Sequence, residues 1–338
     1  MMKPLLLVAL LSAPARAQHP LEPLTAPEIE AAVDIARKAK SLPDAAFFPQ
    51  VALDEPSKEY LRVWKPGRPA ARRAALVVYD RAANKMSEAV VDLTARQLVS
   101  WTPRPSAQPN VMLEEFEMFP AVVKADERWR AAIKKRGLDP DKLWVDLWAA
   151  GPMTASEKST GHRLLRALSY VSEGNKNPYA HPVEGVIALL DANTRKIVEL
   201  VDTGVVPVSA APGDFDDASN PPSRPGLKPL VITQPEGPSF QLDGHEVRWQ
   251  NWVFRYALHP REGPVLYQVS YQDGPKLRMV LHRASLSEML VPYGDPDSNW
   301  SFRNAFDEGE YGIGRMAGPI EPLRDAPANA VFVDAHFA

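Results

Sequence analysis

The side chains that most often do chemistry are few in this sequence, and their spacing limits what they can do. The chain has no Cys, which excludes a disulfide framework, a thiol nucleophile, an iron–sulfur cluster and a Cys-ligated zinc. Any bound metal would therefore need His or carboxylate ligands. The closest two of the seven His residues, His245 and His259, are fourteen positions apart. His181 and His336 are accordingly interpreted as surface or packing residues.

Composition and charge set the class of protein. The 338 residues are 45% hydrophobic and 24% charged, which excludes a disordered chain and a collagen-like fibre. The 39 Lys and Arg against 42 Asp and Glu give a net charge of -3, too balanced to favour nucleic acid or an anionic membrane as a partner. The 34 Pro residues predict many turns, extended connections and short strands.

Residues 1–17 are interpreted as a signal peptide. Lys3 precedes an apolar run at residues 5–11, and Ala15 and Ala17 provide the small residues of a cleavage site. The run is too short to span a bilayer, which needs ~20 apolar residues. Cleavage would leave a chain that begins at Gln18, is periplasmic or secreted, and carries no membrane anchor.

Residues 18–104 are predicted to form a small α+β domain. Thr25 and Glu28 make the pattern of a capping box, and apolar residues recur on one face of a helix that ends near Lys40. The pattern then changes to strands over residues 46–101, including residues 74–79 and 87–93 around a turn at residues 80–85. We expect one helix packed on an antiparallel sheet.

Residues 105–209 repeat this organisation. A helical pattern at residues 111–118 is expected to be interrupted by Pro120, and Asp126 can cap a second helix that faces inward through Trp129 and Ile133. Strands are predicted at residues 143–148, 186–190 and 197–201. The turn at residues 191–196 begins with Asp and ends with Lys, as the first turn does, which suggests one small fold used twice.

The remaining sequence is predicted to be almost entirely β-structure. The Pro- and Gly-rich residues 210–229 have the composition of a linker. Residues 230–338 contain predicted strands at 247–256, 265–271 and 277–283, with a hairpin turn at Asp273 and Gly274. The predicted fold class is therefore α+β: two small domains of helix and antiparallel sheet, followed by the incomplete start of a large β-sandwich.

The order of several short motifs resembles the copper amine oxidases. In the last hundred residues the matching motifs are GPSF at 237–240, VRWQ at 247–250, FR at 254–255, PREG at 260–263, Arg283 with SLSEM at 285–289, VPYGDP at 291–296 and AFDEGEYGIG at 305–314. These motifs resemble the opening of the family's catalytic domain. Upstream, HPL at 19–21 with PLT at 23–25, and NPYAHPVEG at 177–185, resemble its two small preceding domains, called N2 and N3.

The resemblance implies an activity and two site residues. The family oxidises primary amines to aldehydes with release of ammonia and hydrogen peroxide. The residue that matches its proton acceptor is Asp307, and Tyr293 matches the tyrosine whose hydroxyl orients the quinone cofactor. Taken alone, Asp307 would fit an acidic turn and Tyr293 a half-buried residue of a sheet. Ala305 stands where many members have an aromatic gate, and Glu310 is assigned to support of the turn.

The resemblance also implies cofactors for which this chain lacks the residues. The family uses copper, held by three His that include a His-x-His pair, and topaquinone, made from a Tyr that follows Asn and precedes an acidic residue. None of the nine Tyr residues follows Asn, and no His-x-His pair is present. We therefore expect this chain alone to bind neither copper nor quinone and to be inactive.

Our interpretation is that the sequence is the N-terminal part of an exported primary-amine oxidase. The implied partners are a small primary amine, O2 and a second copy of the chain in a homodimer. One alternative is a non-catalytic exported module for binding or scaffolding, derived from an amine oxidase. A second alternative is a chain shortened by a frameshift or an incomplete gene model.

Overall fold

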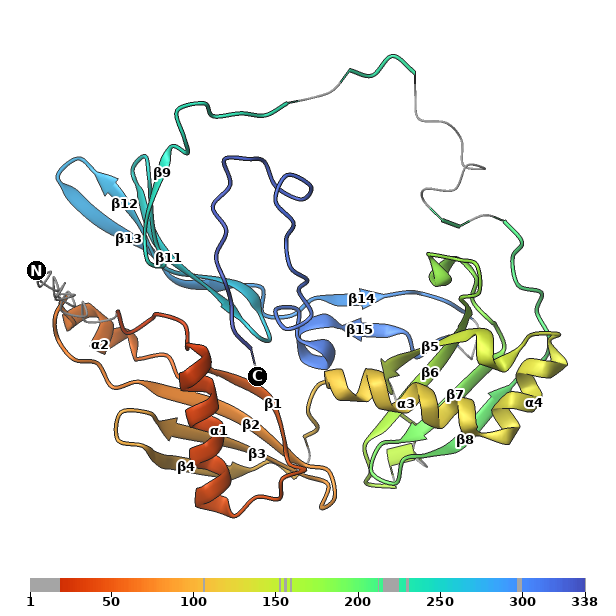
Figure 1. Cartoon of the computed structure of the whole chain (residues 1–338). Helices are drawn as coiled ribbons and strands as arrows, with labels where there is room; N and C mark the ends of the chain where they lie inside the picture. Colours follow the sequence, from red (N-terminus) through yellow and green to blue (C-terminus); the bar gives the residue numbers. More distant parts are fainter. Residues whose placement is uncertain are drawn as a thin grey trace, which may run out of the picture.

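The computed structural model describes residues 19–105, 107–151, 153–154, 157–158, 160–211, 213–214, 225–228, 231–296 and 300–337. Four antiparallel sheets organise these residues, and helices accompany two of them (Figure 1). The predicted signal peptide lies outside the described residues, as does most of the predicted linker at 210–229. None of the described helices has the length and apolar character that crossing a bilayer requires.

The first unit packs one helix on a four-stranded sheet. Helix α1 (Ala26–Lys40) covers strands β1 (Phe47–Leu53), β2 (Arg73–Asp80), β3 (Lys85–Asp92) and β4 (Gln97–Pro103), which pair in chain order. The capping box is present, because Thr25 Oγ1 accepts from the backbone N–H of Glu28 and the Glu28 carboxylate accepts from that of Thr25. The helix predicted here is therefore confirmed. A short helix that the pattern did not indicate, α2 (Lys58–Val63), lies between β1 and β2.

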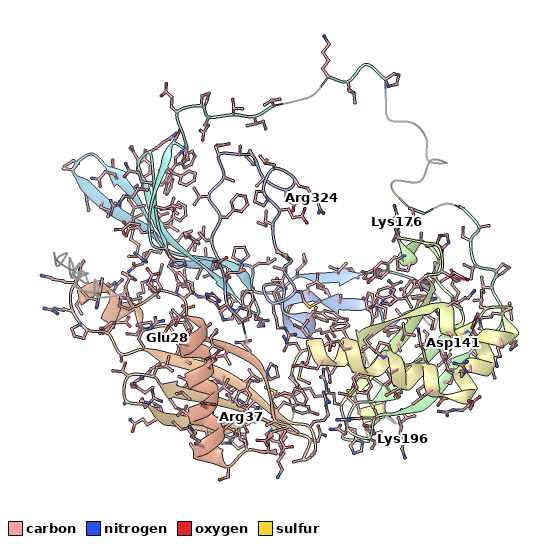
Figure 2. The ribbon with its side chains drawn as sticks, in the orientation of Figure 1. Glu28, Arg37, Asp141, Lys176, Lys196 and Arg324 are labelled. Atoms are coloured by element: carbon pink, nitrogen blue, oxygen red, sulfur yellow. The ribbon has the colours of Figure 1, made fainter. Side chains whose placement is uncertain are left out.

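Two side chains near the ends of α1, those of Glu28 and Arg37, are labelled in Figure 2, and both contact residues outside the helix. Near its start, Glu28 forms an ion pair with Arg72 at 2.8 Å. Near its end, the Arg37 guanidinium donates to the backbone oxygens of Pro43 and Ala46 and lies over the Phe48 ring.

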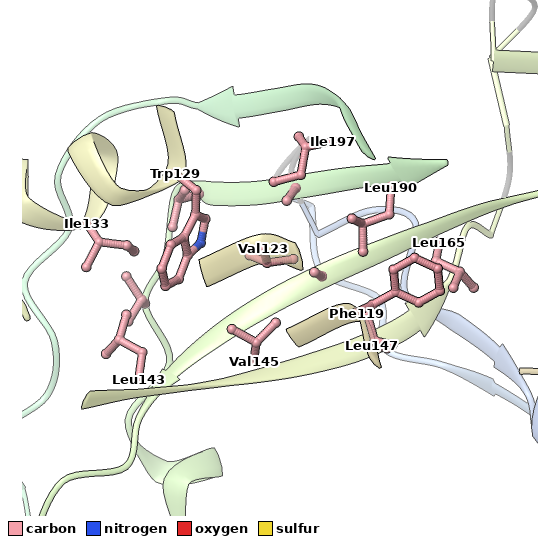
Figure 3. Close-up of a cluster of buried hydrophobic side chains, with 14 of the residues drawn as sticks. Phe119, Val123, Trp129, Ile133, Leu143, Val145, Leu147, Leu165, Leu190 and Ile197 are labelled. Atoms are coloured by element: carbon pink, nitrogen blue, oxygen red, sulfur yellow. The ribbon is translucent and has the colours of Figure 1, made fainter. Parts of the chain in front are cut away.

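The second unit repeats the arrangement with two helices. Helices α3 (Leu113–Ala125) and α4 (Glu127–Lys135) cover strands β5 (Leu143–Ala149), β6 (Leu164–Val171), β7 (Val186–Asp191) and β8 (Lys196–Asp202), again paired in chain order. Single 3-10 turns at Pro140–Lys142 (η1) and Pro178–Ala180 (η2) complete the unit. Figure 3 shows the core, in which Trp129 of α4 is buried and donates its indole N–H to Ser169 Oγ at 3.2 Å. The predicted repeat is confirmed, although strand β6 was not predicted.

The interruption predicted at Pro120 is wrong. Helix α3 continues through Pro120 as far as Ala125. The proline removes one backbone hydrogen bond, but its neighbour Phe119 and the next residue on the same face, Val123, are both fully buried in the core. Burial of these apolar side chains stabilises the helix despite the proline.

The hairpin loops of both units share one geometry. In each loop an Asp pairs with a residue five positions later, Asp80 with Lys85 and Asp191 with Lys196. The residue before each Lys takes a left-handed conformation, with φ of 50° at Asn84 and 56° at Arg195. Both Asp side chains accept backbone N–H groups of their own loop, which explains why the two turns look alike in the sequence.

The third unit consists almost entirely of strands. Strands β9 (Phe240–Asp243), β10 (Glu246–Trp249), β11 (Trp252–His259), β12 (Gly263–Asp273) and β13 (Lys276–Ser285) form an antiparallel sheet in which each pairs with the next. The expected turn at Asp273 and Gly274 is confirmed. The single strand predicted at 247–256 is wrong, because a tight turn at Gln250, with φ of 51°, divides it into β10 and β11.

A two-stranded ribbon connects the third unit to the second. Strands β14 (Leu290–Pro292) and β15 (Asn304–Phe306) pair with each other, and a π-helical turn, η3 (Asp307–Tyr311), follows β15 directly. Trp300 and Phe302, just before β15, pack on Leu168 and Ile187 of the second unit's sheet. The ribbon thus lies against the sheet face opposite to helices α3 and α4 (Figure 1).

Candidate active site

The ribbon carries both residues that the sequence singled out. Val291 pairs with Ala305 at its centre, and one further backbone hydrogen bond extends the pairing at each end. Tyr293 N–H donates to Arg303 O at one end, and Asp307 N–H donates to Met289 O at the other. Tyr293 and Asp307 therefore lie at opposite ends of the ribbon, about 13 Å apart along the strands at ~3.3 Å per residue.

Strand alternation places these residues on one face. Successive side chains of a strand point to opposite faces, and directly paired residues share a face. Tyr293, Ala305 and Asp307 therefore belong to the same face of the ribbon, with Ala305 between the other two. Ala305 is 6% exposed, whereas Phe306 on the other face is 42% exposed. Between the phenol and the carboxylate, this face thus carries only the small, buried side chain of Ala305.

The surroundings of Asp307 suit a proton acceptor. Burial, and secondly the negative charge of Glu288, raise the pKa of the Asp307 carboxyl above its usual range. Among the described residues no side chain forms an ion pair with Asp307. A carboxylate with a raised pKa and no neighbouring cation is a stronger base than one held in an ion pair.

Two further carboxyl groups support the turn that holds Asp307. Glu288 Oε1 accepts from the backbone N–H groups of Glu308 at 3.0 Å and Gly309 at 3.4 Å, and Arg261 donates to Glu288 Oε2 at 3.2 Å. Burial alone would raise the pKa of Glu288, but its hydrogen bonds to Glu308 and to these N–H groups lower it. Glu308 is completely buried and accepts from the Met289 N–H.

Turn η3 is anchored to both α+β units. The Glu310 carbonyl accepts from Val111 N–H at 2.6 Å, and the Tyr311 hydroxyl accepts from Ala149 N–H of β5 at 3.1 Å. Arg315, which follows the turn, donates to the backbone oxygens of Val111 and Tyr311, and to Pro49 O of β1 at 3.3 Å. The position of Asp307 thus depends on residues from all three units.

Glu310 has a different environment from Asp307. Its carboxylate accepts from the Phe306 backbone N–H at 3.0 Å, and burial, followed by the negative charges of Glu288 and Asp307, raises its pKa. The raised pKa would also suit a base. The hydrogen bond instead ties the Glu310 side chain to the backbone of the turn, so we assign it to support of the turn.

Tyr293 lies at the contact between the ribbon and the second unit. Its ring packs edge-to-face on Trp148 of β5, with ring centroids 5.3 Å apart, and the Arg303 guanidinium lies over it at 4.2 Å. The ring is 50% exposed. Arg303 and Trp148 were missed at the sequence level. Arg303 lies opposite Tyr293, but this pairing becomes visible only with the register of the ribbon. No local signal connects Trp148 to a residue so distant in the chain.

The described residues do not provide a copper site. Within them, no three His, Asp or Glu side chains come together as a set that could hold a metal ion. His245, one of the two closest His residues in the sequence, has its Nδ1 within hydrogen-bond distance of the Glu22 carboxylate. The residues present therefore do not fit the copper that the family resemblance implies.

Comparison with known proteins finds one family along nearly the whole chain. The family models of the copper amine oxidase N2 domain, N3 domain and enzyme domain match residues 19–104, 114–216 and 241–338, respectively. A primary amine oxidase of Arthrobacter sp. (strain P1) is 41% identical over 94% of this chain and 49% of its own length. A primary amine oxidase of Klebsiella aerogenes is 36% identical over 95% of this chain and 42% of its own length.

The solved structures include a similar protein. A copper-containing benzylamine oxidase from Hansenula polymorpha is 26% identical, with a TM-score of 0.73 over 88% of this chain and 49% of its own. The chain thus spans about half the length of the relatives it matches. Three consecutive domain matches in the family's order, supported by sequence identity over nearly the whole chain, lead to one conclusion: the chain belongs to the copper amine oxidase family.

Proposed function

We propose that the chain is the N-terminal part of a primary-amine oxidase. This activity converts a primary amine, O2 and water into an aldehyde, ammonia and hydrogen peroxide. The observation that carries the proposal is the placement of Asp307, with its raised pKa, on a ribbon inside the segment that matches the enzyme domain. We further propose the domain boundaries 18–104, 105–209 and 230–338, with a linker at 210–229.

Each residue on the ribbon face has a proposed role. Asp307 takes a proton from the carbon next to the amine nitrogen. Tyr293, at the other end of the face, donates a hydrogen bond that orients the cofactor. Ala305 lies between them and leaves the access path wide, since a small side chain replaces the aromatic gate of many relatives. At ~3.3 Å per residue, about 13 Å separates the proposed base from the cofactor-orienting tyrosine along the ribbon.

No step is assigned to copper or to the quinone, because the described residues include no set of metal ligands and no Tyr in the sequence follows Asn. We propose that the copper ligands and the quinone-forming tyrosine belong to a part of the full-length enzyme that is not in this sequence. The chain alone is accordingly proposed to be inactive.

Export and dimer formation are part of the proposal. The apolar run at residues 5–11 and the cleavage pattern ending at Ala17 support removal of residues 1–17 and a periplasmic or secreted location. The intact mass of exported protein should correspond to a chain that begins at Gln18. An exported protein that retains Lys3 would contradict the cleavage site. Homodimer formation is proposed from the family and can be measured by sedimentation of the full-length enzyme.

The proposed base can be tested by substitution in the full-length enzyme. Asp307→Asn keeps the shape of the side chain but removes the proton acceptor, so kcat should fall by about 10²–10⁴-fold. Cofactor formation does not need this base, so the quinone should still form and still react with a hydrazine. The measurements are amine turnover and titration of the quinone.

Glu310→Gln is the matched control. It lies three positions away and also has a carboxyl with a raised pKa, but its side chain is tied to the Phe306 backbone. Its kcat should fall much less than that of Asp307→Asn. If Glu310→Gln abolished turnover and Asp307→Asn did not, the base would be Glu310. If the full-length protein formed no quinone at all, the non-catalytic alternative would be favoured.

A further inference from the structure

One cation, Arg303, is surrounded by aromatic rings at the Tyr293 end of the ribbon. Its guanidinium lies 4.2 Å from the ring centroid of Tyr293, 4.5 Å from that of Trp300 and 4.6 Å from that of Trp148. A guanidinium is attracted to the face of an aromatic ring within about 6 Å. The three rings come from different segments, so Arg303 joins the start of β15, the end of β14 and strand β5.

Among the described residues, the Arg303 guanidinium has three aromatic rings as neighbours. Its Nε is buried and has no hydrogen-bond acceptor among the described residues. No ion pair to its guanidinium occurs within the same residues, although Asp146 lies close enough to interact electrostatically. Because Arg binds ring faces through both its charge and its plane, this environment favours Arg over the more strongly hydrated Lys.

Two of the rings around Arg303, those of Trp148 and Tyr293, have further contacts. Trp148 donates its indole N–H to Asp146 Oδ2 at 2.9 Å, and Asp146 is buried within β5. Trp148 then contacts the Tyr293 ring edge-to-face at an interplanar angle of 75°. Arg303 is also paired with Tyr293 through the backbone, since its carbonyl accepts the Tyr293 N–H at 3.2 Å. Tyr293 is thus held by its backbone, by a cation over its ring and by an indole.

We propose that Arg303 is a positioning residue that fixes the ring of Tyr293 and thereby the direction of its hydroxyl. The inference rests on the proposed function, in which that hydroxyl orients the cofactor. Tyr293 lies at the end of a short ribbon and is half exposed, so few contacts hold its ring. The guanidinium and Trp148 restrict it to one orientation. Through Trp148, the second α+β unit becomes part of the support of the site.

The first experiment tests the ring contact in this chain without any cofactor. The protein is labelled with 3-fluorotyrosine, and the ¹⁹F resonance of Tyr293 is assigned by its loss in Tyr293→Phe. In the unmodified chain the resonance should be displaced from that of free fluorotyrosine by the cation and the indole. Arg303→Gln should remove most of this displacement, and Arg303→Lys should retain part of it, because the charge remains.

Lys40→Gln is the matched control for the first experiment. It removes a cation that lies 5.3 Å from the Trp101 ring in the first unit, remote from the ribbon. The Tyr293 resonance should not move in this variant. An unchanged Tyr293 resonance in Arg303→Gln, with circular dichroism showing a folded chain, would overturn the inference.

The second experiment uses a double-mutant cycle in the full-length enzyme. Arg303→Gln should lower kcat by about tenfold with little change in KM, and Arg303→Lys should restore part of the loss. If Arg303 acts through the Tyr293 hydroxyl, adding Arg303→Gln to Tyr293→Phe should lower kcat little further than Tyr293→Phe alone.

The two experiments separate the inference from the proposed function. Additive losses in the cycle would show that Arg303 acts elsewhere and would overturn its positioning role. A displaced fluorine resonance together with full activity of Tyr293→Phe would instead contradict the role proposed for Tyr293. In that case the contact between Arg303 and the ring would still stand.

Discussion

At the scale of single residues, the environment that suits Asp307 to take up a proton also makes its charge unfavourable. Burial and the charge of Glu288 raise its pKa, which means that the folded protein disfavours the ionised form. Because the pKa is higher in the folded than in the unfolded chain, ionisation of Asp307 reduces stability as pH rises through the folded value. The proposed base is therefore a site where function and stability oppose each other.

This opposition predicts that Asp307→Asn stabilises the folded chain by an amount that depends on pH. The amide is neutral at every pH, so at pH 7 the variant should have a higher melting temperature than the unmodified chain. The gain should shrink as pH falls toward the ordinary carboxyl range of about 4, where Asp307 is protonated as well. Thermal unfolding followed by circular dichroism at a series of pH values measures this. Asp334→Asn, at an exposed position, should show no such dependence, and a loss of stability in Asp307→Asn at pH 7 would contradict the argument.

At the scale of elements, helix α3 shows how packing overrides a local signal. Pro120 lies eight residues into the helix, where a proline leaves the preceding turn without one hydrogen bond. The helix persists because Phe119 and Val123 are buried on either side of it along the core face. Pro120 therefore still lowers the stability of the helix, and substitution of the proline can remove this loss.

Replacing that proline should stabilise the chain. Pro120→Ala restores a backbone N–H donor and introduces a residue that favours helix. The free energy of unfolding should therefore rise by about 1–3 kcal/mol. Urea denaturation measures the change. Pro27→Ala in the first turn of α1 is the control, because a first-turn proline breaks no helical hydrogen bond, and it should change stability little. Destabilisation by Pro120→Ala would show that the core needs the proline's shape.

The elements that the sequence predicted well are those whose signals are local. The capping box of Thr25 and Glu28 and the loop that begins at Asp80 need only a few neighbouring residues to form. The division of residues 247–256 into two strands depends on a left-handed Gln250, which propensity does not indicate. For the site, the family motifs indicated Asp307 and Tyr293. Their shared face became visible only with the ribbon's register, and Trp148 only with the packing of units.

At the scale of the whole molecule, a buried ionic cluster joins the first two units. Glu115 of α3 is 0% exposed and pairs with Arg163, which precedes β6, at 2.8 Å and with Arg81 of the first unit's β2–β3 loop at 3.4 Å. Arg163 also donates to Pro109 O and Asn110 O, in the segment between the units. One carboxylate thus compensates two largely buried cations at the junction.

Removal of this carboxylate should affect the whole chain. Glu115→Ala leaves two arginines without their shared partner, and breaking a buried ion pair in this way costs about 3–5 kcal/mol of unfolding free energy. Glu115→Gln, which keeps one acceptor, should cost less. Urea denaturation of both variants tests this, with Glu117→Ala at an exposed position of the same helix as the control. Equal stability of Glu115→Ala and Glu117→Ala would rule out the cluster as a structural joint.

The anchoring of η3 has a consequence for the order in which the protein folds. Arg315 reaches back 266 positions to Pro49 and 204 to Val111, and Tyr311 reaches back 162 to Ala149. Contacts between such distant segments close large loops and form slowly. During synthesis, both α+β units emerge from the ribosome and can fold before residue 307 is made. The proposed base is thus placed late, and only on a scaffold that is already correct, so a chain with a misfolded first or second unit does not acquire an ordered proton acceptor.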